Sequence, residues 1–215
     1  MNERSAETPL PVAASVGGVP LTPGDHICVL HRGRAERDQL LAPYFAEGLS
    51  EGHTCLLLAA EGEGRTFCDV LAGTAPMAGQ DCDSLQIQGP HETYLQNGTF
   101  DGERMLAMLY AWSAEMFPNG KGAFARVAAD MSWAQPLVQP AFIDDLIQYE
   151  VKATSWLRSC PQVAMCMYDL DLFSGDLIIP LVKAHPMVWF SGMIVENPYY
   201  LAPEAAYGPP VAGLD

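Results

Sequence analysis

The sequence has few basic residues and no long apolar run. Only 11 lysines and arginines stand against 26 aspartates and glutamates, which gives the 215 residues a formal net charge of -15. That charge makes direct binding to nucleic acid or to an anionic lipid surface unfavourable. No stretch approaches the roughly 20 apolar residues of a membrane helix, and the N-terminus lacks the pattern of a signal peptide. We therefore expect a cytoplasmic protein with no nucleic-acid or membrane partner.

The chain also lacks any CxxC pair, although it has six cysteines. Most of them lie inside apolar runs, and a chain of this length builds a core without a disulfide framework. Buried cysteine usually behaves as a small hydrophobic residue. The sequence therefore predicts free thiols at Cys28, Cys55, Cys68, Cys82, Cys160 and Cys166.

Length and patterning predict one α/β domain. Residues 1–23 and 202–215 have no apolar period and are rich in residues that favour turns, so we expect flexible tails around a domain at 24–201. Between the tails, short β-rich runs alternate with helical periods, which is typical of a mostly parallel central sheet flanked by helices. The expected strands are 26–31, 54–60, 85–88, 123–129, 163–168 and 187–190, and the expected helices are 35–50, 65–71, 101–117, 140–157 and 177–183.

A phosphate-binding loop is missing where one kind of α/β fold would have it. Residues 24–28, 47–52 and the apolar run after them resemble the opening of RecA- and KaiC-like ATPases. Residues 31–38 read HRGRAERD, in place of the Walker A pattern GxxxxGK[ST]. Without those glycines and the hydroxyl, the chain cannot wrap a triphosphate or hold its magnesium ion. The resemblance implies a RecA/KaiC-like fold without a Walker A loop, a pseudo-ATPase that does not hydrolyse nucleotide.

A closer resemblance covers residues 24–200. Four blocks in order carry it: GDHIC at 24–28, CMYD at 166–169 with Phe173 and Gly175, His185-Pro186, and ENPYY at 196–200. The chain resembles the MEDS domain, a sensory domain of methanogen and methylotroph regulators. The resemblance implies a non-enzymatic domain that binds a small organic molecule. It also implies signalling to a separate regulator, such as a histidine kinase, anti-sigma factor or transcription factor, unless the chain is one piece of a longer protein.

Acidic residues follow three of the predicted strands. Ligands of open α/β sheets lie at the carboxyl ends of strands, where the sequence has Glu61, Asp130 and Asp169. The three carboxylates could hold a hard cation or act as acid and base, or Asp130 and Asp169 could cap the turns and helices that follow. Trp133, just beyond Asp130, could form an aromatic wall for an apolar ligand or simply pack against a helix.

A second group of candidates combines nitrogen, sulfur and phenol side chains. His26 and Cys28 share one face of their strand, and Cys166 and Tyr168 share a face of another. With His185 they could supply soft ligands for zinc or copper. The alternative is ordinary buried cysteines and a hydrogen-bonded histidine.

These observations leave three functional hypotheses. The first is a ligand-binding sensory domain that uses His26, Cys28, Asp130, Trp133, Tyr168, Asp169 and His185. The second is a metal- or redox-responsive switch built on His26, Cys28, Cys166 and His185. The third is a pseudo-ATPase that only binds a partner protein through its acidic surface. The sequence identifies no cofactor, and it allows a homodimer.

Overall fold

The computed structural model describes residues 14–75, 82–118 and 124–202. Its centre is a seven-stranded sheet in the order β5-β4-β6-β7-β3-β8-β9. All neighbouring strands are parallel except β8 and β9, which are antiparallel. The predicted α/β class with a mostly parallel central sheet is therefore confirmed. The strands are β3 (His26–His31), β4 (Thr54–Leu58), β5 (Leu85–Gln88), β6 (Ala125–Asp130), β7 (Gln162–Asp169), β8 (Met187–Phe190) and β9 (Met193–Glu196).

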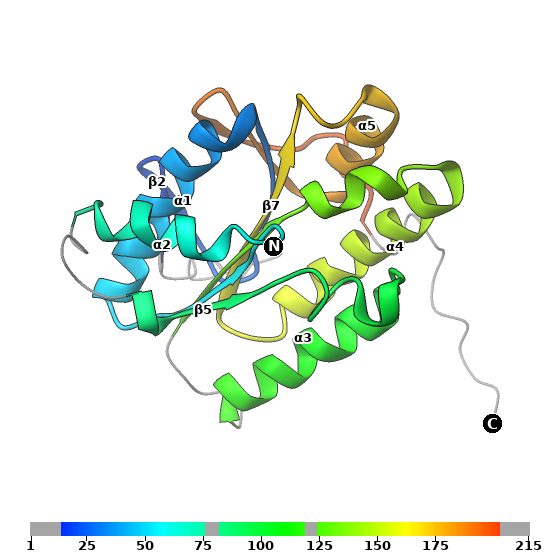
Figure 1. The fold of residues 1–215 in the computed structure, drawn as a ribbon. Helices are drawn as coiled ribbons and strands as arrows, with labels where there is room; N and C mark the ends of the chain where they lie inside the picture. The colour runs from blue at the N-terminus through cyan, green and yellow to red at the C-terminus, as the bar shows by residue number, and fades with distance from the viewer. Residues whose placement is uncertain (1–13, 76–81, 119–123, 203–215) are drawn as a thin grey trace, which may run out of the picture.

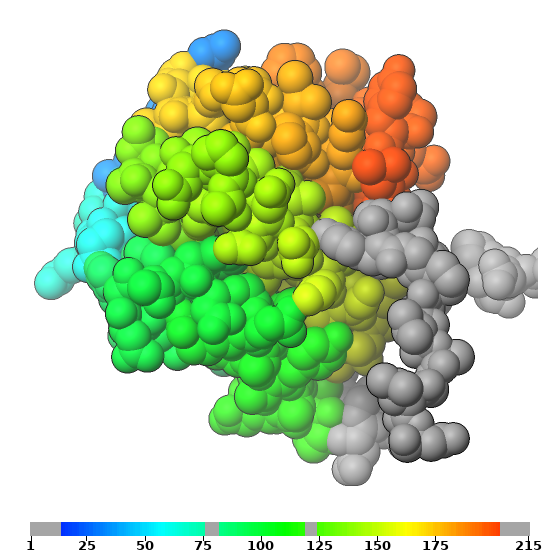
Figure 2. All heavy atoms as spheres, turned by 90° about the vertical axis from the view of Figure 1, so that its right-hand side faces the viewer, coloured from blue at the N-terminus to red at the C-terminus, as the bar shows by residue number. Residues whose placement is uncertain are grey.

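Helices cover both faces of this sheet, as Figure 1 shows. One face is covered by α1 (Gly33–Ser50) and α2 (Gly64–Ala72). The other is covered by α3 (Gly102–Met116), α4 (Pro140–Leu157) and α5 (Gly175–Ala184), which form adjoining bands of surface in Figure 2. Within the described ranges, no helix combines the length and the apolar character needed to cross a membrane.

The two faces of the sheet enclose two separate hydrophobic cores. Successive side chains of a strand point to opposite faces, so a strand between two helical layers must be apolar throughout. In β3, Cys28 and Leu30 pack under α3, α4 and α5, whereas Ile27 and Val29 pack under α1. All six residues of β3 and all six of β6 are buried. This burial explains the continuous apolar runs of the sequence.

Only one residue, Arg32, separates the end of β3 from the start of α1. The helix begins at Gly33, two residues earlier than predicted, and Pro43 lies inside it without delaying its start. A connection this short has no room for a loop that wraps a triphosphate. The short connection and the missing Walker A pattern therefore both argue against a phosphate-binding loop at this position. The RecA-like relationship itself stays a prediction.

The N-terminal segment contains a hairpin that the sequence analysis missed. Strands β1 (Ala14–Val16) and β2 (Val19–Leu21) pair in antiparallel fashion inside the segment that we expected to be a flexible tail. The turn between them uses Gly17, whose φ is 55°, and a Cβ at that position would lie 2.3 Å from the Trp189 ring. The hairpin thus packs on the sheet through Trp189. Residues 1–13 and 203–215 of the predicted tails lie outside the described ranges.

The prediction of six free thiols is wrong for two cysteines. Cys68 in α2 and Cys82 in the 3-10 helix η1 (Cys82–Ser84) form a disulfide, with their Cα atoms 5.6 Å apart. The other four cysteines are free. The separation of 14 residues does not reveal this disulfide in the sequence, because the pairing depends on how the fold brings η1 back to α2.

Candidate functional site

Four polar side chains from four different segments meet between the sheet and the helices α4 and α5. His26 is the first residue of β3, Cys166 lies in the middle of β7, Glu150 lies on α4, and His185 directly follows α5. Their nitrogen, oxygen and sulfur atoms all lie within 4.8 Å of one another. Cys166 is 6% exposed and the other three are at most 1% exposed. We call these four residues the buried cluster.

The carboxylate of Glu150 lies at the centre of the buried cluster. Its Oε1 accepts a hydrogen bond of 2.5 Å from the hydroxyl of Tyr168. Its Oε2 lies 3.5 Å from Sγ of Cys166 and 3.4 Å from Nε2 of both His26 and His185. The rings of the two histidines are close neighbours, with centroids 4.2 Å apart. One carboxylate therefore contacts every other member of the cluster.

A backbone carbonyl fixes the orientation of the His185 ring. Nδ1 of His185 lies 2.8 Å from the carbonyl oxygen of Leu181, which can only accept, so Nδ1 carries a proton. In the neutral ring the lone pair then lies on Nε2, which faces Glu150. Nε2 lies 3.4 Å from Oε2 of Glu150 and is a buried polar atom with no hydrogen-bond partner.

The His26 ring is oriented in the same way by a side chain of α4. Nδ1 of His26 lies 2.9 Å from Oγ1 of Thr154, and that hydroxyl donates to the backbone oxygen of Glu150 at 3.4 Å. The hydroxyl is thus free to accept from Nδ1, which leaves the lone pair of the neutral ring on Nε2. This nitrogen lies 3.3 Å from Sγ of Cys166. Both rings present Nε2 to the carboxylate.

Burial and mutual contact set the charges in the cluster. Burial, followed by the neighbouring His185, lowers the pKa of His26 to about 4 despite the contact with Glu150. Burial alone would raise the pKa of Glu150, whereas a proton on Nε2 of His185 or His26 stabilises the carboxylate and lowers that pKa well below its ordinary value. Burial and then the Glu150 carboxylate raise the pKa of the Cys166 thiol. At neutral pH the cluster therefore contains a carboxylate, a neutral His26 and a protonated thiol.

An enclosed cavity of about 20 Å³ adjoins the cluster. His26 and Cys166 contribute to its wall, and Tyr94 and Tyr149 add two aromatic rings. The remaining lining is apolar and comes from Leu58, Leu109, Val127, Ala129, Ala153, Trp156, Leu157 and Ala164. The cavity is thus mostly apolar and adjoins two members of the cluster.

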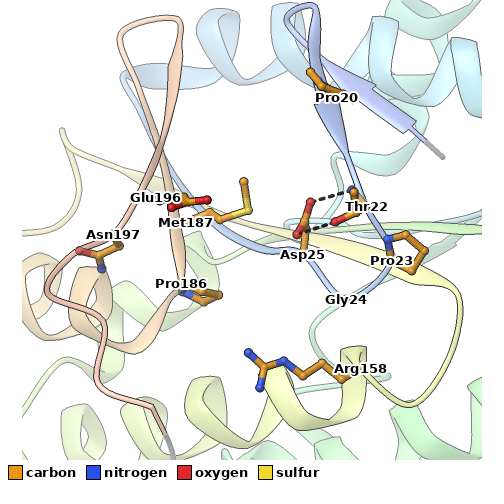
Figure 3. A pocket seen from close by; sticks show the side chains of 10 residues that line it. All are labelled: Pro20, Thr22, Pro23, Gly24, Asp25, Arg158, Pro186, Met187, Glu196 and Asn197. Carbon is orange, nitrogen blue, oxygen red and sulfur yellow. Dashed lines mark hydrogen bonds between the residues drawn. The ribbon is translucent and has the colours of Figure 1, made fainter. Parts of the chain in front are cut away.

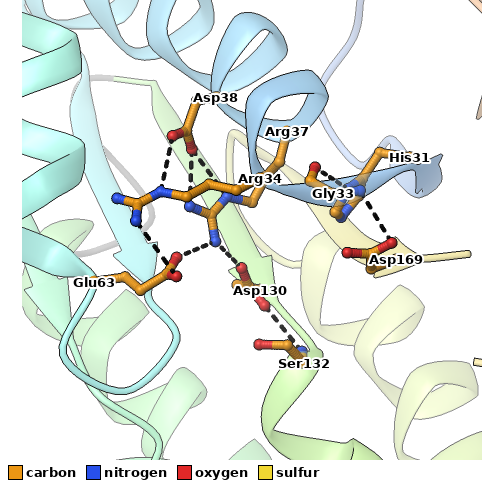
Figure 4. A network of polar contacts seen from close by, with 9 residues as sticks. All are labelled: His31, Gly33, Arg34, Arg37, Asp38, Glu63, Asp130, Ser132 and Asp169. Carbon is orange, nitrogen blue, oxygen red and sulfur yellow. Dashed lines mark hydrogen bonds and ion pairs between the residues drawn. The ribbon is translucent and has the colours of Figure 1, made fainter. Parts of the chain in front are cut away.

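Asp130 lies apart from this cluster, in a network of ion pairs at the carboxyl ends of the strands (Figure 4). Arg37 of α1 contacts Asp130, Asp38 and Glu63. Burial would lower the pKa of Arg37, but its acidic partners raise it above its ordinary value. The other oxygen of Asp130 accepts from the backbone N–H of Ser132 at 2.9 Å. Both oxygens of Asp130 therefore have internal partners.

Asp169 binds the start of a helix. Its Oδ1 accepts from the backbone N–H of Gly33, the first residue of α1, at 3.1 Å, and from that of Asp171 at 2.9 Å (Figure 4). A helix N-terminus attracts anions, and here a carboxylate of the chain itself occupies that place. Asp130 and Asp169 thus each accept a hydrogen bond from the backbone just beyond their own strand, and Asp169 also binds the start of α1.

Trp133 lies in the 3-10 helix η4 (Ser132–Leu137) and is buried within a group of aromatic rings. It stacks on Tyr94 with ring centroids 4.5 Å apart and also contacts Phe100 and Phe142. Tyr94 lines the enclosed cavity, whereas Trp133 does not. Trp133 therefore packs behind the cavity wall.

A larger pocket of about 750 Å³ opens at the surface near the beginning of β3 and β8 (Figure 3). Gly24 and Asp25, which precede His26, lie on one side of it, and Pro186, which follows His185, lies on another. Arg158 points toward this group from the end of α4. The pocket is thus next in sequence to two members of the buried cluster.

Comparison with known proteins places this geometry in a family. A model of the MEDS domain, described as the methanogen/methylotroph, DcmR sensory domain, matches residues 25–186. The chain belongs to the MEDS family. The match begins one residue before His26 and ends one residue after His185, so it contains the whole buried cluster. It confirms the family resemblance seen in the sequence.

One curated relative and one solved structure extend this comparison. The MEDS chain is 25% identical over 171 residues to the transcriptional repressor DcmR of Methylorubrum extorquens, an alignment that covers 79% of this chain and 61% of that repressor. It also resembles a structure titled a structural study of PH0250 from Pyrococcus horikoshii OT3. That likeness has a TM-score of 0.53 at 11% identity and covers 86% and 91% of the two chains. The second likeness concerns the fold alone.

Three of the four blocks that carry the MEDS resemblance meet at the buried cluster. The block at 24–28 supplies His26, the block at 166–169 supplies Cys166 and Tyr168, and the block at 185–186 supplies His185. Cys28, also predicted for this site, is the register partner of Cys166 on the adjacent strand and is buried, but it is not one of the four clustered residues.

Sequence reasoning missed Glu150 and Thr154, which complete the site from α4. A signal for both was present, since they are polar residues on the buried stripe that Leu146, Tyr149, Ala153 and Leu157 define. An acid at such a position is almost never buried without partners. That rule would have directed attention to Glu150.

Proposed function

We propose that this MEDS domain is a sensory domain that binds a small organic molecule in the enclosed cavity and signals the binding to a regulator. The single observation that carries the proposal is the cavity itself, whose mostly apolar walls include the side chains of His26 and Cys166. A largely apolar pocket with a few convergent polar groups is the usual form of a small-molecule site. Membership of a sensory-domain family supports the same conclusion.

The size of the cavity restricts the ligand. A cavity needs a volume of roughly 10–15 Å³ to hold one water molecule, and the volume of this cavity is about 20 Å³. As it stands the cavity has room for about one water molecule, so a compound with one or two carbon atoms must move the walls outward to enter. A nucleotide or a sugar does not fit, and the Arg37 network fills the strand ends where a nucleotide would otherwise bind.

The position of the cavity provides a route for signalling. Its walls come from β3, β4, β6 and β7 and from α3 and α4. A ligand that expands the cavity therefore pushes α3 and α4 away from the sheet, because packed interiors do not absorb extra volume without movement. These helices form the outer surface in Figure 2, where a regulator can detect the change. The partner is a histidine kinase, an anti-sigma factor or a transcription factor.

Thermal unfolding in the presence of small ligands tests the proposal. Alcohols, amines and haloalkanes with one or two carbons should raise the unfolding temperature. At a concentration of 100 times their Kd, the free energy of unfolding should increase by about 2.7 kcal/mol. Larger members of each series should lose the effect as size increases. Stabilisation by ATP with magnesium, accompanied by turnover, would contradict the proposal.

A matched pair of variants locates the binding. Ala153→Val adds two methyl groups at the cavity wall, whereas Ala42→Val adds the same volume to a buried site in α1 under the other face of the sheet. Ala153→Val should abolish ligand stabilisation and Ala42→Val should keep it, whatever each change does to the unliganded protein. An undiminished response in Ala153→Val would place the ligand elsewhere.

A metal-responsive switch is the second candidate function. The observation that favours it is the convergence of two imidazoles, a carboxylate and a thiol in the buried cluster. The switch predicted from sequence used Cys28 where the structure has Glu150. The first step for such a function is a metal site.

A further inference from the structure

We propose that His26, Glu150, Cys166 and His185 form a four-coordinate site for a transition-metal ion of the zinc class. The four donors are two imidazole nitrogens, a thiol sulfur and a carboxylate oxygen, which are the usual ligands of zinc in proteins. This inference goes beyond the proposed function and does not depend on it, because an ion can be held here whether or not the cavity takes an organic ligand.

The spacing of the donor atoms fits a tetrahedral ion. Bonds of about 2.0–2.1 Å to nitrogen or oxygen and 2.3 Å to sulfur place tetrahedral ligand atoms roughly 3.3–3.6 Å from one another. Oε2 of Glu150 lies 3.4 Å from both Nε2 atoms and 3.5 Å from Sγ of Cys166. Nε2 of His26 lies 3.3 Å from that sulfur. Four of the six distances between donor atoms therefore match a tetrahedral ion, and the whole set lies within 4.8 Å.

The surrounding contacts have the form that metal-binding histidines require. Such a histidine usually donates its second ring N–H to a carbonyl, carboxylate or other acceptor, which fixes the tautomer and directs the free lone pair at the metal. Here the Nδ1 atoms of His185 and His26 contact the Leu181 carbonyl and the Thr154 hydroxyl. Tyr168 donates to Oε1 of Glu150 and leaves Oε2 facing the histidines.

An ion also accounts for the unpartnered nitrogen. Nε2 of His185 is fully buried and has no hydrogen-bond partner, an arrangement that is normally unfavourable. A bound ion gives this lone pair a partner. It also balances the charge of the site, because a divalent cation neutralises the Glu150 carboxylate together with the Cys166 thiolate.

Binding at this site requires a thiolate. A cysteine thiol must lose its proton before its sulfur can bond to a metal ion. On binding, the thiol proton passes to solvent, the thiolate sulfur bonds to the ion, and the ion releases its water ligands to solvent. Because all four ligands are buried, the ion enters as the chain folds or during local opening.

Refolding in the presence of cobalt tests the assignment. The full chain is unfolded with chelator, then refolded with Co²⁺, a spectroscopically visible substitute for Zn²⁺. We expect one Co²⁺ per chain, with the strong visible bands of tetrahedral cobalt and a thiolate-to-cobalt charge-transfer band. A wild-type chain that refolds without stoichiometric Co²⁺ would overturn the proposal.

Two cysteine variants identify the sulfur ligand. Cys28 and Cys166 are register partners on adjacent strands, both buried on the same face of the sheet, so Cys28→Ala is a matched control for Cys166→Ala. Cys166→Ala should lose the charge-transfer band completely, and Cys28→Ala should keep it. A band that survives in Cys166→Ala, or that disappears in Cys28→Ala alone, would refute the ligand set.

X-ray absorption of the zinc-loaded wild-type chain keeps the test decisive if Cys166→Ala does not fold. The proposal requires one sulfur at about 2.3 Å and three nitrogen or oxygen neighbours at about 2.0–2.1 Å. Two sulfur neighbours, or a shell of oxygen alone, would contradict it.

Discussion

The phenol of Tyr168 and the carboxylate of Glu150 form a buried hydrogen bond of 2.5 Å that joins β7 to α4. Burial and then the neighbouring carboxylate raise the pKa of Tyr168, so the phenol keeps its proton and remains a donor at any ordinary pH. The pair contributes to folding and also fixes which oxygen of Glu150 faces the histidines.

Tyr168→Phe tests the energetic value of this bond. Removal of the hydroxyl leaves Oε1 of Glu150 buried without its donor, which should lower the free energy of unfolding by about 1–3 kcal/mol. Urea unfolding followed by fluorescence measures the loss. Tyr199→Phe, at a tyrosine that is 73% exposed, is the control and should change stability by less than about 0.5 kcal/mol.

Gly48→Ala should destabilise the protein although alanine favours helices. A Cβ at position 48 would lie 2.6 Å from Cδ of Arg126, a fully buried arginine that donates to the Tyr44 carbonyl and to Glu47. Displacement of that guanidinium should cost about 1–3 kcal/mol. Gly175→Ala is the matched control, since its nearest neighbour would lie 3.7 Å away. Equal thermal stability of both variants would show that the site relaxes freely.

Asp169→Ala should weaken the start of α1. The substitution removes the acceptor of the Gly33 N–H, and the loss of a helix-capping acceptor costs about 0.5–2 kcal/mol. Asp171→Ala, which removes only an exposed ion pair with Arg32, should cost less than about 1 kcal/mol. Hydrogen exchange in the first turn of α1 should increase in Asp169→Ala and stay unchanged in Asp171→Ala.

Acid should remove the stabilising contribution of Glu47. Burial would raise the pKa of this carboxyl, but hydrogen bonds from Arg126 and Ser15 hold it below its ordinary value of 4.5. A lowered pKa in the folded state means that the contribution is complete above about pH 4.5 and is lost as the pH falls further.

The comparison of wild type with Glu47→Gln measures this effect. The difference in melting temperature between them should be constant from pH 7 to pH 5 and should shrink below pH 4.5. Glu115→Gln, at an exposed position on α3, should give no pH-dependent difference. If the difference in melting temperature for Glu47→Gln stayed constant down to pH 3, Arg126 would not stabilise the Glu47 carboxylate.

Much of the fold could be predicted from sequence because the central strands are buried on both faces. Such strands leave continuous apolar runs, and the limits of α4 and β8 were predicted to the residue. The hairpin β1–β2 and the edge strand β9 were missed because they are short. β9 is mostly exposed and has no apolar alternation. Their turns, Gly17-Gly18 and Ser191-Gly192, all have positive φ and are the signal that could have revealed them.

The candidate site was only partly predictable for a different reason. His26, Cys166 and His185 stand out as chemically distinctive residues next to strands. Glu150 does not, because an acid on a helix usually faces solvent. Its burial follows from the rotation of α4, which Trp156 and Leu157 fix by packing into the core. The sequence also cannot show that Asp130 and Asp169 are satisfied by internal contacts that span 93 and 136 positions.

The buried cluster is closed by β3, β7, α4 and the segment after α5, whose residues span positions 26 to 185. Under the proposed metal site, the ion would leave only when one of these elements separates from the others, so its residence time would be set by the rate of that opening and not by diffusion. Under the proposed sensory function, such a detector would respond slowly and would keep its signal after the stimulus has gone.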